Sequence, residues 1–88
     1  MGYEIAVSYN FNNPIKEKII KKGEKYLSVG HYEQYELRGR RNALHSQRCI
    51  LTILFEDNAW EIQKFIRFIK KLYGVKLESI CKDNEVLC

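Results

Sequence analysis

The sequence predicts an α+β domain whose elements follow the order strand, helix, strand, strand, helix, strand. Two periodicities support this prediction. Apolar and polar residues alternate over residues 3–9, which is the pattern of a strand with one buried face. Residues 48–55 form an apolar strand, with Cys49, Leu51, Ile53 and Phe55 on one face and Ile50, Thr52 and Leu54 on the other. Apolar residues recur every three or four positions over residues 15–27 and 62–73, which is the pattern of a helix with one buried face.

A turn rich in asparagine separates the first strand from the first helix. Asn13 is the expected N-cap, and Pro14 suits the first helical position because an N–H would have no partner there. The helix that follows is amphipathic, with apolar residues on one face and most of its lysines elsewhere. Its apolar face consists of Ile15, Ile19, Ile20, Tyr26 and Leu27.

The middle of the chain contains two strands joined by a loop. Residues 31–38 are expected to form the second strand, with Tyr35 and Leu37 facing inward. Residues 39–47 are rich in turn formers and lack a clear periodicity, so we expect them to form the loop of a hairpin. The third strand, residues 48–55, is the most apolar segment of the chain.

The second helix has clear start and stop signals. Asn58 and Glu61 have the spacing of a capping box, and Gly74 is the expected C-terminal stop. Residues 75–81 follow as the last strand. Residues 82–88 are expected to form a frayed or loosely docked tail.

This order of elements, with right-handed crossovers, is the ferredoxin-like arrangement. It predicts a single domain over residues 1–81, followed by the short tail of residues 82–88. The sheet is expected to be antiparallel and four-stranded, with strand order 4-1-3-2. Both helices are expected on one face of this sheet.

Composition and cysteine usage restrict the class of protein. The 88 residues carry a formal net charge of +4, and no apolar stretch approaches the roughly 18 residues that a membrane-spanning helix needs. The N-terminus lacks a basic region followed by an apolar run. Cys49, Cys81 and Cys88 have no metal-binding spacing, so we expect a cytoplasmic protein without a metal or cofactor. Pairing of Cys81 with Cys88 is left open.

Arginine is concentrated in and beside the hairpin loop. Guanidinium and amide groups suit phosphate oxygens and base edges, so the loop is a candidate contact for nucleic acid. Contact with an acidic protein partner is one alternative, and a solvated loop whose arginines pair with nearby glutamates is another. The candidate residues are Arg38, Arg40, Arg41, Asn42, His45 and Arg48.

A second basic surface is predicted on the second helix. At about 100° per residue, Trp60, Lys64, Arg67 and Lys71 lie together, opposite the apolar stripe. An aromatic ring among cations can stack on a base or anchor a protein contact. The alternative is that Trp60 packs over the sheet edge as an ordinary structural residue.

The sheet face away from the helices is expected to display aliphatic side chains at its centre. Ile50 and Leu54 are candidate self-association residues, because apolar side chains on an uncovered face favour a second layer, and we therefore expect a homodimer. The outward positions of the first and third strands lack the aromatic rings on which RNA-recognition motifs stack bases. The expected open-face residues are Glu4, Ala6, Ser8, Tyr32, Gln34, Glu36, Ile50, Thr52, Leu54, Lys76, Glu78 and Ile80.

These surfaces lead to three functional hypotheses. The leading one is a non-enzymatic binding module that contacts nucleic acid through the hairpin loop and the basic helix face. The alternative is an oligomeric regulatory or protein-interaction subunit that binds an acidic protein partner. The third is a small metal-independent ribonuclease with His45 as general base. At the level of the fold alone, the chain is similar to small signalling proteins that oligomerise through their sheets, although it lacks their glycine-rich nucleotide-binding signature.

Overall fold

The computed structural model describes residues 2–37, 47–83 and 85–87. These residues form an antiparallel sheet and two helices, and the strands lie in the order β2-β3-β1-β4-β5. The elements, in chain order, are β1 (Gly2–Asn10), α1 (Lys16–Lys25), β2 (Ser28–Leu37), β3 (Gln47–Glu56), α2 (Ala59–Lys70), β4 (Val75–Lys82) and β5 (Glu85–Val86).

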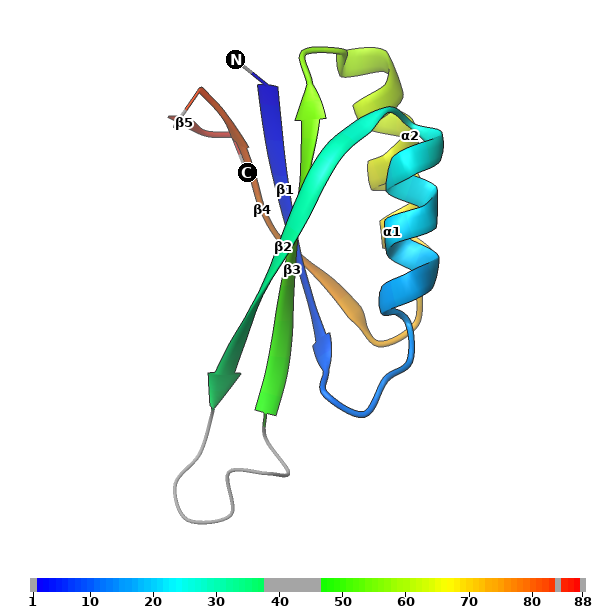
Figure 1. The fold of residues 1–88 in the computed structure, drawn as a ribbon, viewed down its shortest axis with the longest axis vertical. Helices are drawn as coiled ribbons and strands as arrows, with labels where there is room; N and C mark the ends of the chain where they lie inside the picture. Colours follow the sequence, from blue (N-terminus) through cyan, green and yellow to red (C-terminus); the bar gives the residue numbers. More distant parts are fainter. Residues whose placement is uncertain (1, 38–46, 84, 88) are drawn as a thin grey trace.

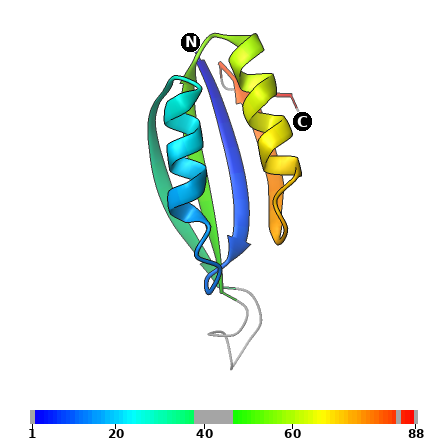
Figure 2. The same cartoon turned by 90° about the vertical axis from the view of Figure 1, so that its right-hand side faces the viewer.

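The molecule has two layers. Both helices lie side by side on one face of the sheet, and no described helix covers the opposite face (Figure 1, Figure 2). The central strands β1 and β3 alternate between these faces, because successive side chains of a strand point to opposite sides. The helix-side residues of β1 and β3 are buried, namely Ile5, Val7, Tyr9, Cys49, Leu51, Ile53 and Phe55.

The predicted α+β architecture is confirmed, with two helices on an antiparallel sheet in which β1 and β3 are central. The predicted order of the first four strands is also present within the sheet. The predicted number of strands was wrong, because the described sheet has five.

The fifth strand, β5, lies within residues 82–88, which were predicted to be a frayed tail. A tight turn reverses the chain, and Asp83 in this turn has φ 50°, a left-handed conformation that Asp tolerates better than most residues. Beyond the strand, the Leu87 N–H donates a hydrogen bond to the Ile80 carbonyl at 2.7 Å. The backbone pairs of β5 with β4 are Val86 with Cys81 and Glu85 with Lys82.

The helix starts agree with the sequence at α2 but not at α1. The Asn58 side chain accepts a hydrogen bond from the Glu61 N–H at 3.2 Å, as the capping-box spacing predicts. The predicted N-cap of α1 was wrong. The Asn13 N–H instead donates to the Asn10 carbonyl at 2.8 Å, and Ile15 occupies the N-cap position without a side-chain cap. Asn13 is therefore part of the preceding turn.

The core between the layers is centred on Phe65 of α2. Its side chain is 0% exposed, and its ring lies 4.9 Å from the ring of Phe55 between centroids, with a 56° tilt. Tilted aromatic pairs add to the stabilisation that burial provides. Ile19 of α1 and Ile69 of α2 are also fully buried, so both helices contribute to the same core.

Phe65→Ala should lower the free energy of unfolding by about 3–5 kcal/mol, because it removes buried apolar area and leaves a cavity. Phe11→Ala is the matched control, since Phe11 is 51% exposed in the turn after β1, and it should change stability by less than about 0.5 kcal/mol. Urea denaturation followed by circular dichroism measures both. Equal effects of the two substitutions would contradict this description of the core.

Candidate functional site

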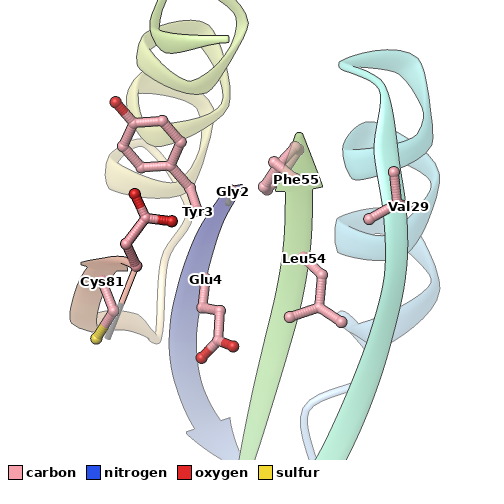
Figure 3. A pocket seen from close by; sticks show the side chains of 8 residues that line it. Gly2, Tyr3, Glu4, Val29, Leu54, Phe55 and Cys81 are labelled. Carbon is pink, nitrogen blue, oxygen red and sulfur yellow. The ribbon is translucent and has the colours of Figure 1, made fainter. Parts of the chain in front are cut away.

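The sheet face opposite the helices is hollowed along much of its length. One hollow of about 250 Å³ is bordered by Val29, Leu54, Glu4 and Cys81, which project from four neighbouring strands (Figure 3). A second, of about 300 Å³, adjoins it, because Glu4 and Cys81 line both. We call the two together the open-face hollow. The second part is lined by Glu4, Ala6, Tyr32, Gln34, Ile50, Thr52, Glu78, Ser79 and Cys81.

A β-bulge in β4 changes which residues reach this face. Ala6 pairs with Ser79 but Val7 pairs with Leu77, so Glu78 is an extra residue between two paired positions. After the bulge, each side chain of β4 points to the face opposite the one that regular alternation would give it. The prediction that Ile80 lies on the open face was therefore wrong: Ile80 packs against the core.

Ser8 joins three strands at the middle of the open face. Its side chain is only 1% exposed although no described helix covers it. The hydroxyl donates a hydrogen bond to the Glu78 carboxylate and accepts one from Arg48 Nη2 at 3.0 Å. Glu78 is the bulge residue of β4 and Arg48 lies on β3, so one hydroxyl connects β1 with both its neighbours.

The predicted self-association residues lie in this region. Ile50 and Leu54 project from β3 on the open face and are half-buried. Each borders part of the hollow, Ile50 beside Tyr32 and Leu54 beside Val29. Tyr32 is 45% exposed and Val29 is 61% exposed. Apolar surface on the open face therefore extends from the central strand to the edge strand β2.

The predicted basic strip of α2 forms one wall of a groove between the two helices. Lys64, Arg67 and Lys71 line this groove, which has a volume of about 290 Å³. Trp60 is 69% exposed at the start of the same strip, and Lys64 Nζ lies 5.6 Å from the centre of its ring. The groove also contains residues that the sequence did not single out as binding candidates: Lys22, Tyr26 and Phe68.

The arginine-rich loop falls outside the described residues. Five of the six candidate residues lie in this part of the chain, and the sixth, Arg48, is described. The Arg48 guanidinium is bonded to Ser8 on the open face. The candidates outside the described part are Arg38, Arg40, Arg41, Asn42 and His45.

A polar cluster joins α1 to the edge strand on the helix side of the sheet. Lys16 forms an ion pair with Glu33, and the Tyr35 hydroxyl donates to Glu33 Oε2 at 3.1 Å. The Lys16 hydrogen bond is the main reason that the pKa of Glu33 is lowered from its ordinary value. Close by, burial raises the pKa of Tyr9, whose hydroxyl has no hydrogen-bond partner among the described residues. The Lys16–Glu33 pair of this cluster joins the start of α1 to β2, on the side of the sheet away from the open face.

The described residues do not form a metal or redox centre. Within residues 2–37, 47–83 and 85–87, no three His, Cys, Asp or Glu side chains are grouped so as to hold a metal ion. Cys49 and Cys81 are free thiols, and burial raises the pKa of Cys49. Cys88 lies outside the described residues, so the question whether it pairs with Cys81 stays open. None of the described helices is both long enough and apolar enough to cross a membrane.

Comparison with known proteins gives a likeness of fold. No family model matches the sequence, and no curated protein matches it. The crystal structure of a candidate PII-like signaling protein from Thermus thermophilus superimposes with a TM-score of 0.66. The alignment covers 91% of this chain and 84% of that chain, with 9% sequence identity. At this identity the likeness shows a shared fold alone.

The leading functional prediction, contact with nucleic acid, is contradicted by this comparison. The neighbour in fold is described as a signaling protein, and that description mentions no nucleic acid. The open face agrees with this correction. Base stacking needs aromatic rings on the central strands, whereas Ala6, Ile50 and Thr52 occupy those positions. In addition, Arg48 is engaged with Ser8.

Ser8→Ala should lower the free energy of unfolding by about 1–3 kcal/mol, because it removes a hydroxyl that satisfies Arg48 and Glu78 at a site shielded from water. Ser79→Ala is the control on the same face. Ser79 is half-buried and its hydroxyl bonds to no described residue, so the change should be within about 0.5 kcal/mol. Thermal and urea unfolding measure both. A Ser8→Ala variant as stable as Ser79→Ala would show that the hydrogen bonds of the Ser8 hydroxyl do not contribute to the free energy of unfolding.

Proposed function

We propose that this chain is a non-enzymatic regulatory module that acts through protein–protein contact, and that a second copy of the chain covers its open sheet face. The observation that carries the proposal is the uncovered face itself, with aliphatic and aromatic side chains around the open-face hollow. Contiguous apolar surface of this kind is typical of interaction sites in soluble proteins. The signaling description of the protein that shares the fold supports the regulatory part of the proposal.

The centre of the open face suits a flat contact with another sheet. Ser8 and Thr52 are 1% and 5% exposed and Ala6 has a small side chain, and the long charged side chains of Arg48 and Glu78 are both bonded to the Ser8 hydroxyl. Ile50 and Leu54 stand half-exposed beside them. Two packed sheets lie about 10 Å apart, and small or aliphatic side chains such as Ala6, Ile50 and Leu54 fit into that space.

The charges on this face favour a second copy as the occupant. Glu4 and Lys76 are both exposed, and neither has an ion-pair partner among the described residues. Lys76 lies opposite Ser8, four residues along β1 from Glu4, so the two charges are about 13 Å apart along the strands. In a two-fold pair with strands running in opposite directions, Lys76 of each copy approaches Glu4 of the other. An isologous interface needs self-complementarity of this kind.

The proposal assigns no reaction to the chain. The ribonuclease alternative depends on His45, which lies outside the described residues. A cytoplasmic location is part of the proposal, and the free thiol of the buried Cys49 supports it because reducing compartments keep thiols unpaired.

Replacing both Ile50 and Leu54 with Glu should give a folded monomer. Covering a half-exposed aliphatic side chain contributes about 1 kcal/mol, and a charge in its place adds a desolvation cost. Association should therefore weaken by at least about a hundredfold. Sedimentation velocity over a wide range of protein concentrations measures the oligomeric state, and circular dichroism verifies folding.

The matched control replaces Phe11 and Tyr73 with Glu. These side chains are 51% and 98% exposed in the turns after β1 and before β4, and the change in charge is the same. The control should associate like the unmodified chain. A chain that is already monomeric at the highest concentration would overturn the proposal, and so would equal dissociation of both variants.

A further inference from the structure

The groove between α1 and α2 is a concave surface with a strongly cationic lining. We call it the interhelical groove, and it lies on the side of the molecule opposite the open face (Figure 2). Four cationic and two aromatic side chains line it, and no carboxylate does. The lining residues are Lys22 and Tyr26 from α1 and its C-cap, and Lys64, Arg67, Phe68 and Lys71 from α2 and its C-cap.

Most of this positive charge is not neutralised within the described structure. Only Lys64 has a carboxylate partner there, Glu61, at 3.4 Å. Lys22, Arg67 and Lys71 form no ion pair with any described residue. Collecting like charges in one concavity destabilises a domain slightly through repulsion, while it raises the local concentration of anions.

The acidic residues of α1 point away from the groove. At about 100° per residue, Glu17 and Glu24 lie about 140° and 160° around the helix from Lys22. Lys18 and Lys25 lie within about 60° of Lys22 but do not line the groove. The carboxylates of α1 therefore lie away from the groove, whereas Lys22 lines it.

The shape of the basic surface suits an extended chain better than a compact ligand. From Trp60 to Lys71 the strip follows α2 for eleven residues, which is about 16 Å. An extended polypeptide covers that distance with about five residues. Trp60 is 69% exposed at one end of the strip, and exposed tryptophan and arginine side chains are frequent anchors of protein contacts.

The aromatic rings in the groove and beside it already bind cations on their faces. Lys22 Nζ lies 5.1 Å from the centre of the Phe68 ring, and Lys64 Nζ lies 5.6 Å from the centre of the Trp60 ring. These contacts hold the ammonium groups over flat apolar surfaces at the groove. A carboxylate that enters therefore meets positioned cations, which lowers the conformational entropy that binding has to remove.

We propose that the interhelical groove binds an extended acidic segment of a partner protein, about five residues long and rich in Asp and Glu. Carboxylates of the segment pair with Arg67, Lys71 and Lys22, and its backbone runs along α2 toward Trp60. This site does not depend on the proposed self-association, because the groove and the open face lie on opposite sides of the sheet. A dimer formed through the open face leaves both grooves accessible.

The test uses a capped glutamate peptide of about eight residues, long enough to span the strip, and a glutamine peptide of the same length. Calorimetry measures binding, and the fluorescence of Trp60, the only tryptophan of the chain, reports its location. The glutamate peptide should bind saturably and change the Trp60 emission. Its affinity should decrease as salt is added, because the contacts are between exposed charges.

Two variants with the same change in net charge distinguish binding in the groove from general attraction to a positively charged protein. Arg67→Gln with Lys71→Gln removes two groove cations and should weaken binding about tenfold. Lys21→Gln with Lys70→Gln removes two exposed lysines that do not line the groove and should weaken binding less than about twofold. Both variants should sediment like the unmodified chain, because neither changes the open face. Loss of peptide binding can therefore be distinguished from loss of self-association.

Three outcomes would overturn the proposal. Equal weakening by both variants would show that binding follows net charge and has no defined site. Tighter binding of inorganic tripolyphosphate than of the glutamate peptide would assign the groove to a phosphate ligand. Absence of saturable peptide binding in calorimetry at low salt would show that the groove does not recognise acidic segments.

Discussion

In the part of the chain that the structure describes, helices cover one face of the sheet only, and the rest of the structure depends on this constraint. Phe65 and Ile69 of α2 and Ile19 of α1 are fully buried, and all of them lie on the same side of the sheet. Two short helices provide one core layer and no more. The other face carries small and internally bonded side chains at its centre, and we propose that another copy of the chain covers its apolar part.

One extra residue in β4 determines the chemistry of the open face. The bulge at Glu78 turns Ile80 into the core and places Ser79 and Cys81 on the open side. The same residue extends to the hydroxyl of Ser8, which also holds Arg48. The Arg48 guanidinium and the Glu78 carboxylate are thus held by the same buried hydroxyl. The apolar part of the open face lies on β3 and on the edge strand β2.

Local patterns predicted the features that depend on neighbouring residues in the chain. The alternation in β1 and β3 and the capping box at Asn58 were sufficient to locate those elements. The bulge in β4 and the two-residue strand β5 could not be predicted, because a single irregular residue or a strand of two residues leaves no periodic signal.

The interhelical groove could not be predicted for another reason. Lys22 and Arg67 are far apart in sequence, and only the packing of α1 beside α2 brings them to one concave surface. The nucleic-acid hypothesis counted Arg48 with the arginines of the loop, whereas the Arg48 guanidinium is bonded to Ser8 on the open face.

Coverage of the open face by a second copy of the chain can be measured at single side chains. Paramagnetic relaxation by a soluble gadolinium chelate reports how far individual methyl groups are accessible to solvent. If a second copy covers the face, relaxation at Ile50 and Leu54 should weaken as the protein concentration rises, while Leu27, 61% exposed at the end of α1, should stay unchanged. Equal accessibility of Ile50 and Leu54 at all concentrations would contradict the proposed contact.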